Sequence, residues 1–255
     1  MTSDSEASRN NVAVSALSDN GVVRDHNEDS VVVGAWTLCG SEVQVPQTLV
    51  FTDDEPLLVA VADGLGGHPA GEVASAVAVE MLARSRPLPA DEGGLRELIQ
   101  ACNHAVYDEA AHDADRTGMG TTVSGLILRG DAALVFNVGD SRVYIFDGED
   151  LVLATIDDNP PLAPGQTHTA VLTQMLGGHA APRDVDVHAA ALPRPERARY
   201  LVCTDGLSDV VSEDQILAIL SEHEGEQAVH ELWQAAMNAG GPDNITLALV
   251  ENLEQ

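Results

Sequence analysis

The stretch Leu57-Leu58-Val59-Ala60-Val61-Ala62-Asp63-Gly64 decides the fold of this chain. Its continuous apolar character predicts a strand buried inside a sheet. The strand runs directly into an aspartate and a glycine, and a glycine leaves room for the backbone to approach a ligand. The stretch therefore predicts a buried sheet that presents a carboxylate at one end.

The same arrangement recurs at other predicted strands, each of which has an acidic residue at one end. These acids are Asp205, Asp140, Asp243 and the neighbours Glu28 and Asp29. Carboxylates crowded together repel one another unless a cation lies between them. Oxygen-only ligands point to a hard cation, Mg²⁺ or Mn²⁺, rather than zinc. Two such ions can activate a bridging water and hold a phosphoryl group for in-line displacement.

An Asp-Gly pair is also the commonest hairpin turn. One such pair in this chain is more simply a turn than a metal ligand. Asp147-Gly148 lies between the apolar runs 143–146 and 151–153, so we assign that pair to a turn. Spacing by itself therefore predicts a metal-dependent hydrolase and leaves its substrate open.

The rest of the pattern predicts antiparallel sheets covered by helices, because strands and helices do not alternate regularly. Residues 39–56 read as an irregular excursion or weak hairpin, and 157–169 as a loop. A capping box of Ser212 and Gln215 starts one helix. Strands are expected at 12–17, 30–33, 57–62, 123–128, 132–138, 142–146, 151–154, 199–203 and 245–250, and helices at 70–84, 94–112, from 212 and at 225–239.

The acidic composition disfavours some classes of binding partner. The 255 residues carry 12 basic and 41 acidic side chains, a net charge of −29, and every basic residue is an arginine. Such a surface repels nucleic acid and anionic lipid. The three cysteines are widely spaced, there is no apolar leader, and the apolar runs are too short to span a membrane. We expect a cytoplasmic protein.

Seven motifs in order resemble the metal-dependent protein phosphatases of type 2C in their bacterial form, over about residues 12–250. The motifs are Gly21-Val22-Val23-Arg24-Asp25-His26-Asn27-Glu28-Asp29-Ser30, Asp63-Gly64-Leu65-Gly66-Gly67-His68, Gly120-Thr121-Thr122, Asn137-Val138-Gly139-Asp140-Ser141-Arg142-Val143-Tyr144, Leu172-Thr173-Gln174-Met175-Leu176-Gly177, Thr204-Asp205-Gly206-Leu207-Ser208-Asp209 and Asp243-Asn244-Ile245-Thr246. The resemblance implies an α+β fold, a four-layer α/β/β/α sandwich of two antiparallel sheets flanked by helices. It also implies a polar tail at 1–11 and a single catalytic domain at 12–251.

The activity implied is hydrolysis of phosphoserine and phosphothreonine in proteins, with water bridging two Mn²⁺ or Mg²⁺ ions. Asp63 would bridge both ions with help from the Gly64 carbonyl, and Glu28 would serve one of them. Asp205 and Asp243 would serve the other ion, and Asp140 with Asp205 would hold a weaker third. Supporting residues would be Asp29, Asp209 and Asn244. Arg24 would bind phosphate through its two-pronged guanidinium.

Some residues leave alternatives open. His68 would be either a proton donor to the leaving group or a supporting residue at the start of the helix that follows. Gln174 stands where relatives usually have arginine, and the segment 157–171 is shorter than usual, so substrate recognition is open. Two other functions remain: a regulatory binding module, or a phosphatase of small metabolites. The expected partners are phosphorylated proteins, bound by a monomer.

Overall fold

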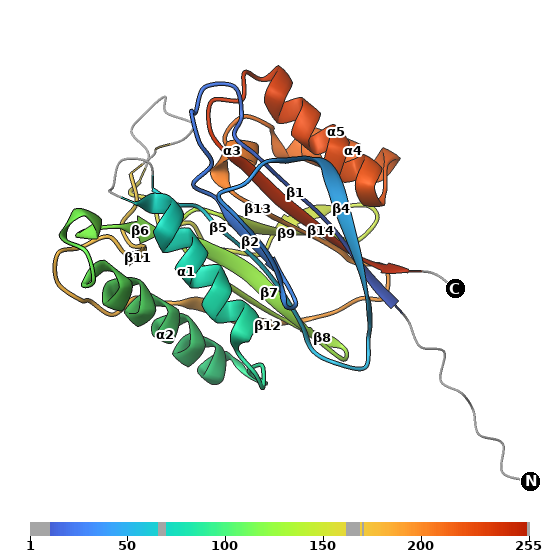
Figure 1. The fold of residues 1–255 in the computed structure, drawn as a ribbon. Coiled ribbons are helices and arrows are strands. Elements are labelled where there is room, and N and C mark those ends of the chain that lie inside the picture. The colour runs from blue at the N-terminus through green and yellow to red at the C-terminus, as the bar shows by residue number, and fades with distance from the viewer. Residues whose placement is uncertain (1–10, 66–69, 162–168, 170, 254–255) are drawn as a thin grey trace, which may run out of the picture.

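Two six-stranded antiparallel sheets lie face to face, with helices on their outer sides, in the computed structural model (Figure 1). The structure describes residues 11–65, 70–161, 169 and 171–253. The first sheet has the order β10 (Leu151–Leu153), β9 (Arg142–Phe146), β13 (Arg199–Cys203), β14 (Ile245–Leu253), β1 (Asn11–Asp19) and β4 (Val43–Thr52). The second has the order β12 (His188–Pro193), β8 (Ala132–Val138), β7 (Val123–Arg129), β5 (Leu57–Ala62), β2 (Ser30–Val33) and β3 (Trp36–Cys39). This is the predicted four-layer sandwich.

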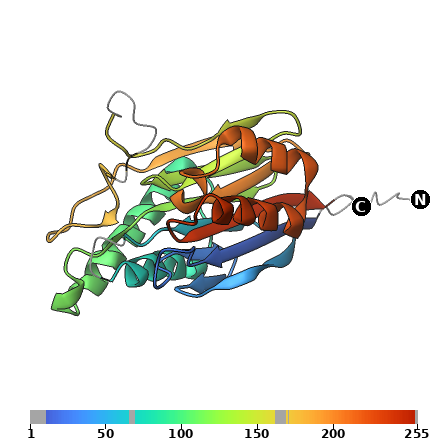
Figure 2. The same cartoon turned by 90° about the horizontal axis from the view of Figure 1, so that it is seen from above.

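Helices cover both outer faces. Figure 1 shows α1 (Gly71–Arg84) and α2 (Glu92–Ala110) along the second sheet, and α4 (Glu213–Glu222) and α5 (Gly225–Asn238) along the first. The short helix α3 (Asp205–Ser208) follows β13 directly. Seen from above, the start of β1 and the end of β14 lie on the same side (Figure 2), in agreement with the pairing of Asn11 with Leu253.

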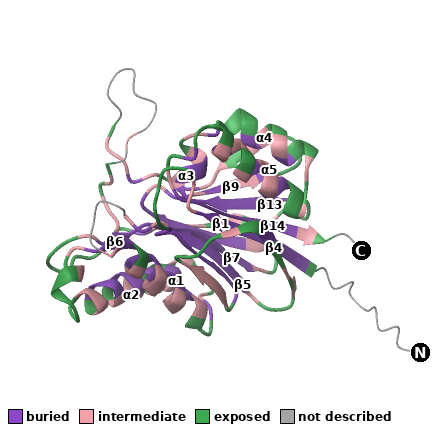
Figure 3. Ribbon diagram, turned by 45° about the horizontal axis from the view of Figure 1, so that its top comes forward, coloured by how far each residue is buried: buried purple, intermediate pink, exposed green. Residues whose placement is uncertain are grey.

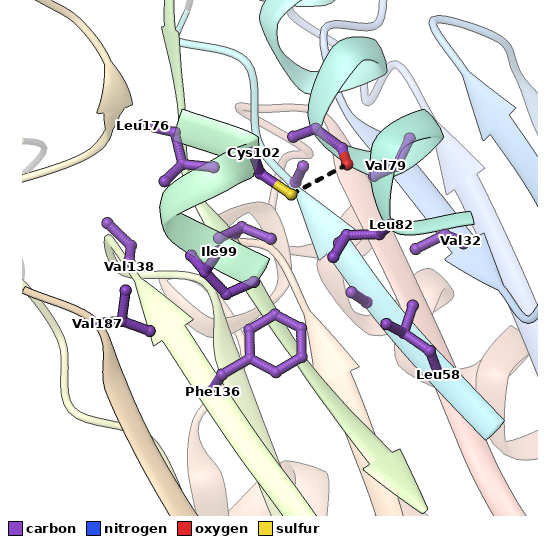
Figure 4. Close-up of a cluster of buried hydrophobic side chains, with 14 of the residues drawn as sticks. Val32, Leu58, Val79, Leu82, Ile99, Cys102, Phe136, Val138, Leu176 and Val187 are labelled. Atoms are coloured by element: carbon purple, nitrogen blue, oxygen red, sulfur yellow. Dashed lines mark hydrogen bonds between the residues drawn. The ribbon is translucent and has the colours of Figure 1, made fainter. Parts of the chain in front are cut away.

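Three apolar layers hold these elements together, and central strands such as β5 and β7 are buried on both faces (Figure 3). One layer lies between the sheets and contains Val59 and Val202. A second joins the first sheet to α4 and α5. The third joins the second sheet to α1 and α2, with Phe136 and Ile99 at its centre (Figure 4). Burial on both faces explains why the strands read as continuous apolar runs.

Antiparallel pairing explains why the acids gather at one end of the sandwich. Ser30, at the start of β2, pairs with Ala62, at the end of β5, so the acids just outside those residues become neighbours. In the first sheet, Cys203 near the end of β13 pairs with Leu247 near the start of β14. β8 runs parallel to β5, because β7 is antiparallel to both, so its end reaches the same edge.

The strands predicted at 30–33, 57–62, 132–138, 142–146 and 199–203 have those bounds, and the Ser212 capping box is present. Asp147 is a turn residue, as predicted: its carboxylate accepts from the backbone N–H groups of Glu149 and Asp150.

The prediction for residues 39–56 is wrong. Most of that segment forms β4, a ten-residue strand that pairs with β1 and ends the first sheet. Pro46 discouraged a strand assignment, but an edge strand tolerates proline because one side of it forms no ladder hydrogen bonds. The pairing also shifts register between Ala16 and Ser18, which interrupts the regular pattern. Strand β12, which pairs with β8, was not predicted either.

Residues 1–10 of the predicted polar tail lie outside the described residues. Within the described part of the chain, no helix is both long enough and apolar enough to cross a membrane.

Candidate functional site

Asp63 and Gly64 directly follow β5, where several hydrogen bonds hold the backbone. The Asp63 carbonyl accepts from Thr122 N at 2.9 Å and from Thr121 Oγ1 at 2.8 Å. Gly64 N donates to the Glu28 carbonyl at 3.2 Å. A Cβ added at Gly64 would lie 2.3 Å from the carbonyl oxygen of Gly71, so the close approach to α1 requires glycine.

Asn244 organises the loop between β1 and β2, which contains Arg24, Glu28 and Asp29. Its Oδ1 accepts from Glu28 N at 2.9 Å, and its Nδ2 donates to the carbonyls of Asn20 and His26 at 3.0 Å each. The residue is buried. Asn244 therefore holds the backbone next to Glu28.

Asp29 is buried at the start of β2, and its Oδ2 accepts from Thr204 Oγ1 at 2.9 Å. Burial raises its pKa to about 7, against hydrogen bonds from Thr246 and Thr204 that lower it. The nearby charges of Asp243 and Glu28 raise it further. These two threonines had no role in the sequence prediction, although both lie in motifs that it quoted.

Asp205 begins α3, and its position depends on the glycine that follows. A Cβ at Gly206 would lie 1.9 Å from the Asn244 carbonyl oxygen, so the end of β13 packs directly against the residue before β14. Asp209 N then donates to the Asp205 carbonyl at 2.8 Å and closes the short helix. This packing places Asp205 close to Asp243.

The effect of each acid on the pKa values of the others shows which acids lie close together. Asp63 and Asp205 are half-buried, and desolvation by the surrounding protein raises the pKa of each well above its usual range. Further increases come from Asp205, Asp29 and Asp243 acting on Asp63, and from Asp140, Asp243 and Asp209 acting on Asp205. The structure therefore brings acids from both sheets into one electrostatic group.

Asp140 lies at the side of this group, after β8. Burial raises its pKa to about 6, and a hydrogen bond from Asn159 Nδ2 to its Oδ2, at 3.1 Å, opposes that shift. Asn159 also donates to the Val171 carbonyl at 3.0 Å, so it ties the segment around Val171 to Asp140. Asn159 was not predicted, because nothing in its local sequence marks it as a partner of a residue 19 positions away.

Arg24 reaches the group from the β1–β2 loop. Its Nη2 donates to Asp243 Oδ2 at 2.6 Å, and its side chain is 40% exposed. Burial alone would lower its pKa, but the hydrogen bond to Asp243 and the charges of Asp243, Glu28 and Asp63 raise it. The guanidinium is thus a permanent positive charge at the edge of the acids.

The donor set fits divalent cations. Among the described residues, Oδ1 of Asp29 and Oδ1 of Asp205 are buried without a hydrogen-bond partner. Buried oxygens of this kind carry an energetic penalty unless they are hydrogen-bonded or bind a cation. No three of the predicted metal acids have ligand atoms all within 4.8 Å of one another, so they are spread more widely than one compact group.

His68 lies outside the described residues, so its alternative roles stay as predicted. Gln174 is within the described part, and its side chain contacts Asp158 and Asp186. Its Nε2 donates to Asp158 Oδ1 at 2.9 Å, and its Oε1 accepts from Asp186 N at 2.9 Å.

Comparison with known proteins gives consistent matches. The family model described as Protein phosphatase 2C matches residues 47–254. Serine/threonine protein phosphatase PstP of Mycobacterium tuberculosis is 34% identical over 256 residues, which cover 92% of this chain and 44% of that protein. Serine/threonine phosphatase stp of Listeria welshimeri is 31% identical over 258 residues, which cover 93% and 95%. The chain thus spans less than half the length of the mycobacterial relative.

Solved structures agree with the fold. The catalytic domain of PstP in complex with two manganese ions superposes with a TM-score of 0.78 at 31% identity, over 96% of this chain and 100% of that one. Serine/threonine phosphatase Stp1 from Staphylococcus aureus gives a TM-score of 0.76 at 26% identity, over 95% of each chain. The predicted sandwich is confirmed by these matches.

Proposed function

Because this chain belongs to the protein phosphatase 2C family, as its motifs predicted, we propose that it hydrolyses phosphoserine and phosphothreonine in proteins with the help of two divalent ions. The observation that carries the proposal is the convergence of Asp63, Asp205 and Asp243 from both sheets. The buried, unpartnered carboxylate oxygens support it. The two manganese ions in the PstP structure support the number and type of ion.

We assign the predicted roles to the residues at this site. Asp63 would hold both ions together with the Gly64 carbonyl, and Glu28 would hold the first ion. Asp205 and Asp243 would hold the second. When bound, the pair of ions supplies activation of a water nucleophile and charge neutralisation for in-line displacement at phosphorus.

Other side chains hold the carboxylates near the ions and the phosphate in position. Thr204 and Thr246 hold the carboxylate of Asp29, and Asn244 holds the backbone of Glu28. Thr121 and Thr122 fix the backbone that follows β5. Arg24 is placed to bind the phosphate as a charged donor, which fits the geometry of guanidinium with phosphate oxygens.

Turnover of phosphoserine and phosphothreonine peptides with Mn²⁺ tests this proposal. Activity is expected with the ion, and EDTA should remove it. Asp63→Asn and Asp205→Asn should each abolish turnover, because each removes a charge from an ion's immediate surroundings. Glu80→Gln is a control with the same change of charge, because Glu80 pairs with Arg84 in the last turn of α1. Full turnover in metal-free buffer would contradict the two-ion mechanism.

Sugar phosphates in the same assay separate the alternatives. Faster turnover of sugar phosphates than of phosphopeptides would identify a metabolite phosphatase, and no turnover of either with Mn²⁺ bound would identify a binding module. We further propose that residues 12–251 form one catalytic domain, active as a monomer in a reducing compartment. The three cysteines, all free, support the reducing compartment.

A further inference from the structure

His26, Glu28 and Glu72 place an imidazole and two carboxylates at the edge of the candidate site. One ligand atom from each lies within 4.8 Å of the other two, and within the described ranges this is the only group of three with that spacing. His26 belongs to the loop between β1 and β2, whereas Glu72 lies in the first turn of α1. Residues 46 positions apart in the chain therefore meet here.

The chemistry of this group differs from that of the oxygen-only acids. One imidazole with carboxylates is a ligand set that zinc accepts, with bonds of about 2.0–2.2 Å and tetrahedral geometry. Neighbouring ligand atoms in such a site lie about 3.3 Å apart. His26 Nε2 is hydrogen-bonded to Glu28 Oε1 at 3.2 Å, and a zinc ion that replaced the shared proton would keep the two atoms at about that separation. Glu72 is exposed, so its carboxylate is free to rotate toward the pair.

The charges also favour a cation. The carboxylates of Glu28 and Glu72 lie close enough to repel each other, and a bound cation would relieve that repulsion. His26 is accessible to an incoming ion, because its side chain is 66% exposed.

We propose that His26, Glu28 and Glu72 form a zinc site, and that zinc bound there slows the phosphatase by occupying Glu28. The zinc site rests on the geometry of the three side chains alone. Its inhibitory effect rests on the proposed function, in which Glu28 serves a catalytic ion. His26 and Glu72 have no part in that catalytic set, so both are available for substitution.

Equilibrium dialysis against Zn²⁺ with Mn²⁺ in excess tests the site without measuring catalysis. The wild-type chain should retain zinc, and His26→Gln and Glu72→Gln should each weaken zinc binding by at least about tenfold. Loss of an outer partner of a metal ligand already costs about 10–100-fold in affinity, so loss of a direct ligand should cost no less. His104→Gln is a matched control, because His104 is exposed and lies 3.5 Å from a single carboxylate, that of Asp184. It should bind zinc as the wild type does.

Turnover in the same buffers tests the inhibition. Without zinc, His26→Gln and Glu72→Gln should match the wild type, and with zinc they should retain activity at about tenfold higher concentration. Equal zinc binding by His26→Gln and the wild type would overturn the site and would indicate that zinc replaces manganese among the catalytic acids. Zinc bound through His26 without loss of turnover would overturn the inhibitory role. An inactive protein that still binds zinc through His26 would overturn the proposed function and leave the zinc site standing.

Discussion

Arg24 Nη2 donates to Asp243 Oδ2 across 2.6 Å, so the residue assigned to phosphate is bonded to a residue assigned to an ion. The other Asp243 oxygen, Oδ1, accepts from the backbone N–H of Asn244 at 2.9 Å. Both oxygens therefore have a donor. An ion that binds Asp243 must share Oδ2 with Arg24 or displace it, and a displaced guanidinium becomes available to phosphate.

Arg24→Ala should consequently bind Mn²⁺ more tightly than the wild type. The pair is partly exposed, and exposed ion pairs contribute up to about 1 kcal/mol, so the gain should be up to about fivefold. Calorimetric titration with Mn²⁺ measures it. Arg86→Ala is the control for loss of one positive charge, because Arg86 donates to the Ser85 carbonyl far from the acids. Equal or weaker binding by Arg24→Ala would show that the two cations do not compete.

The same variant should be a poor catalyst. A hydrogen bond to a charged group contributes about 1.5–3 kcal/mol, so kcat/KM on a phosphopeptide should fall roughly ten- to a hundredfold. Turnover at saturating peptide should fall less than in Asp205→Asn, since the ions remain bound. An unchanged kcat/KM would mean that Arg24 does not contact the phosphate.

Asp140→Ala should leave two tightly bound ions and lower activity on peptides. Asp140 lies at the edge of the acid group, and the contact that fixes its side chain is the amide of Asn159. A third ion beside it would have few protein ligands and would bind weakly. Calorimetry and peptide turnover together decide the role. If Asp140→Ala loses a tightly bound ion, then Asp140 is a ligand of one of the two main ions. If peptide turnover is unchanged, then Asp140 is only a turn residue.

The metal-free protein should lose stability as pH rises from about 4 to above 7. Burial raises the folded-state pKa of Asp140 to about 6 and that of Asp29 to about 7, whereas an unfolded aspartate titrates near 3.9. Between these values the folded chain holds more protons than the unfolded one, so the free energy of unfolding falls as pH increases.

Thermal melts in EDTA across this range measure the effect. Asp29→Asn should flatten the dependence, because an amide carries no titrating proton. Saturating Mn²⁺ should reverse the trend, since the ion binds ionised carboxylates and stabilises the folded chain by mass action. Melting temperatures in EDTA that rise steadily from pH 4 to 8 would contradict the raised pKa values.

Gly64→Ala should destabilise the chain and weaken ion binding together. Its Cβ would lie 2.3 Å from the Gly71 carbonyl oxygen and 2.5 Å from the Glu28 carbonyl oxygen, and both are backbone atoms that cannot rotate away. Overpacking of this kind typically costs about 1–3 kcal/mol. Gly93→Ala is the control, because its Cβ meets nothing closer than 3.4 Å; its stability should stay within about 1 kcal/mol of the wild type. If Gly64→Ala melts and binds Mn²⁺ as the wild type does, then α1 has shifted to accommodate the extra methyl group.

The sequence by itself determined the strands and the acids. A strand buried on both faces is apolar throughout, so 57–62 and 199–203 could be located from local composition, and the carboxylates that follow them stood out by contrast. The seven motifs then identified the family, because their order is more specific than any one of them. Strand β4 was not predicted because it contains Pro46, which an edge strand tolerates, and because it is mostly exposed and lacks the continuous apolar run of a buried strand.

Only the tertiary structure decided which side chains touch. Asn159 reaches Asp140, Thr204 reaches Asp29, and Glu72 joins His26, each across a separation that local sequence does not encode. The pairing of Arg24 with Asp243 spans 219 positions and depends on the packing of the β1–β2 loop against the residues before β14. Local sequence sets what a residue is able to bind. Sheet register and loop packing set what lies within reach, and that is a property of the whole folded chain.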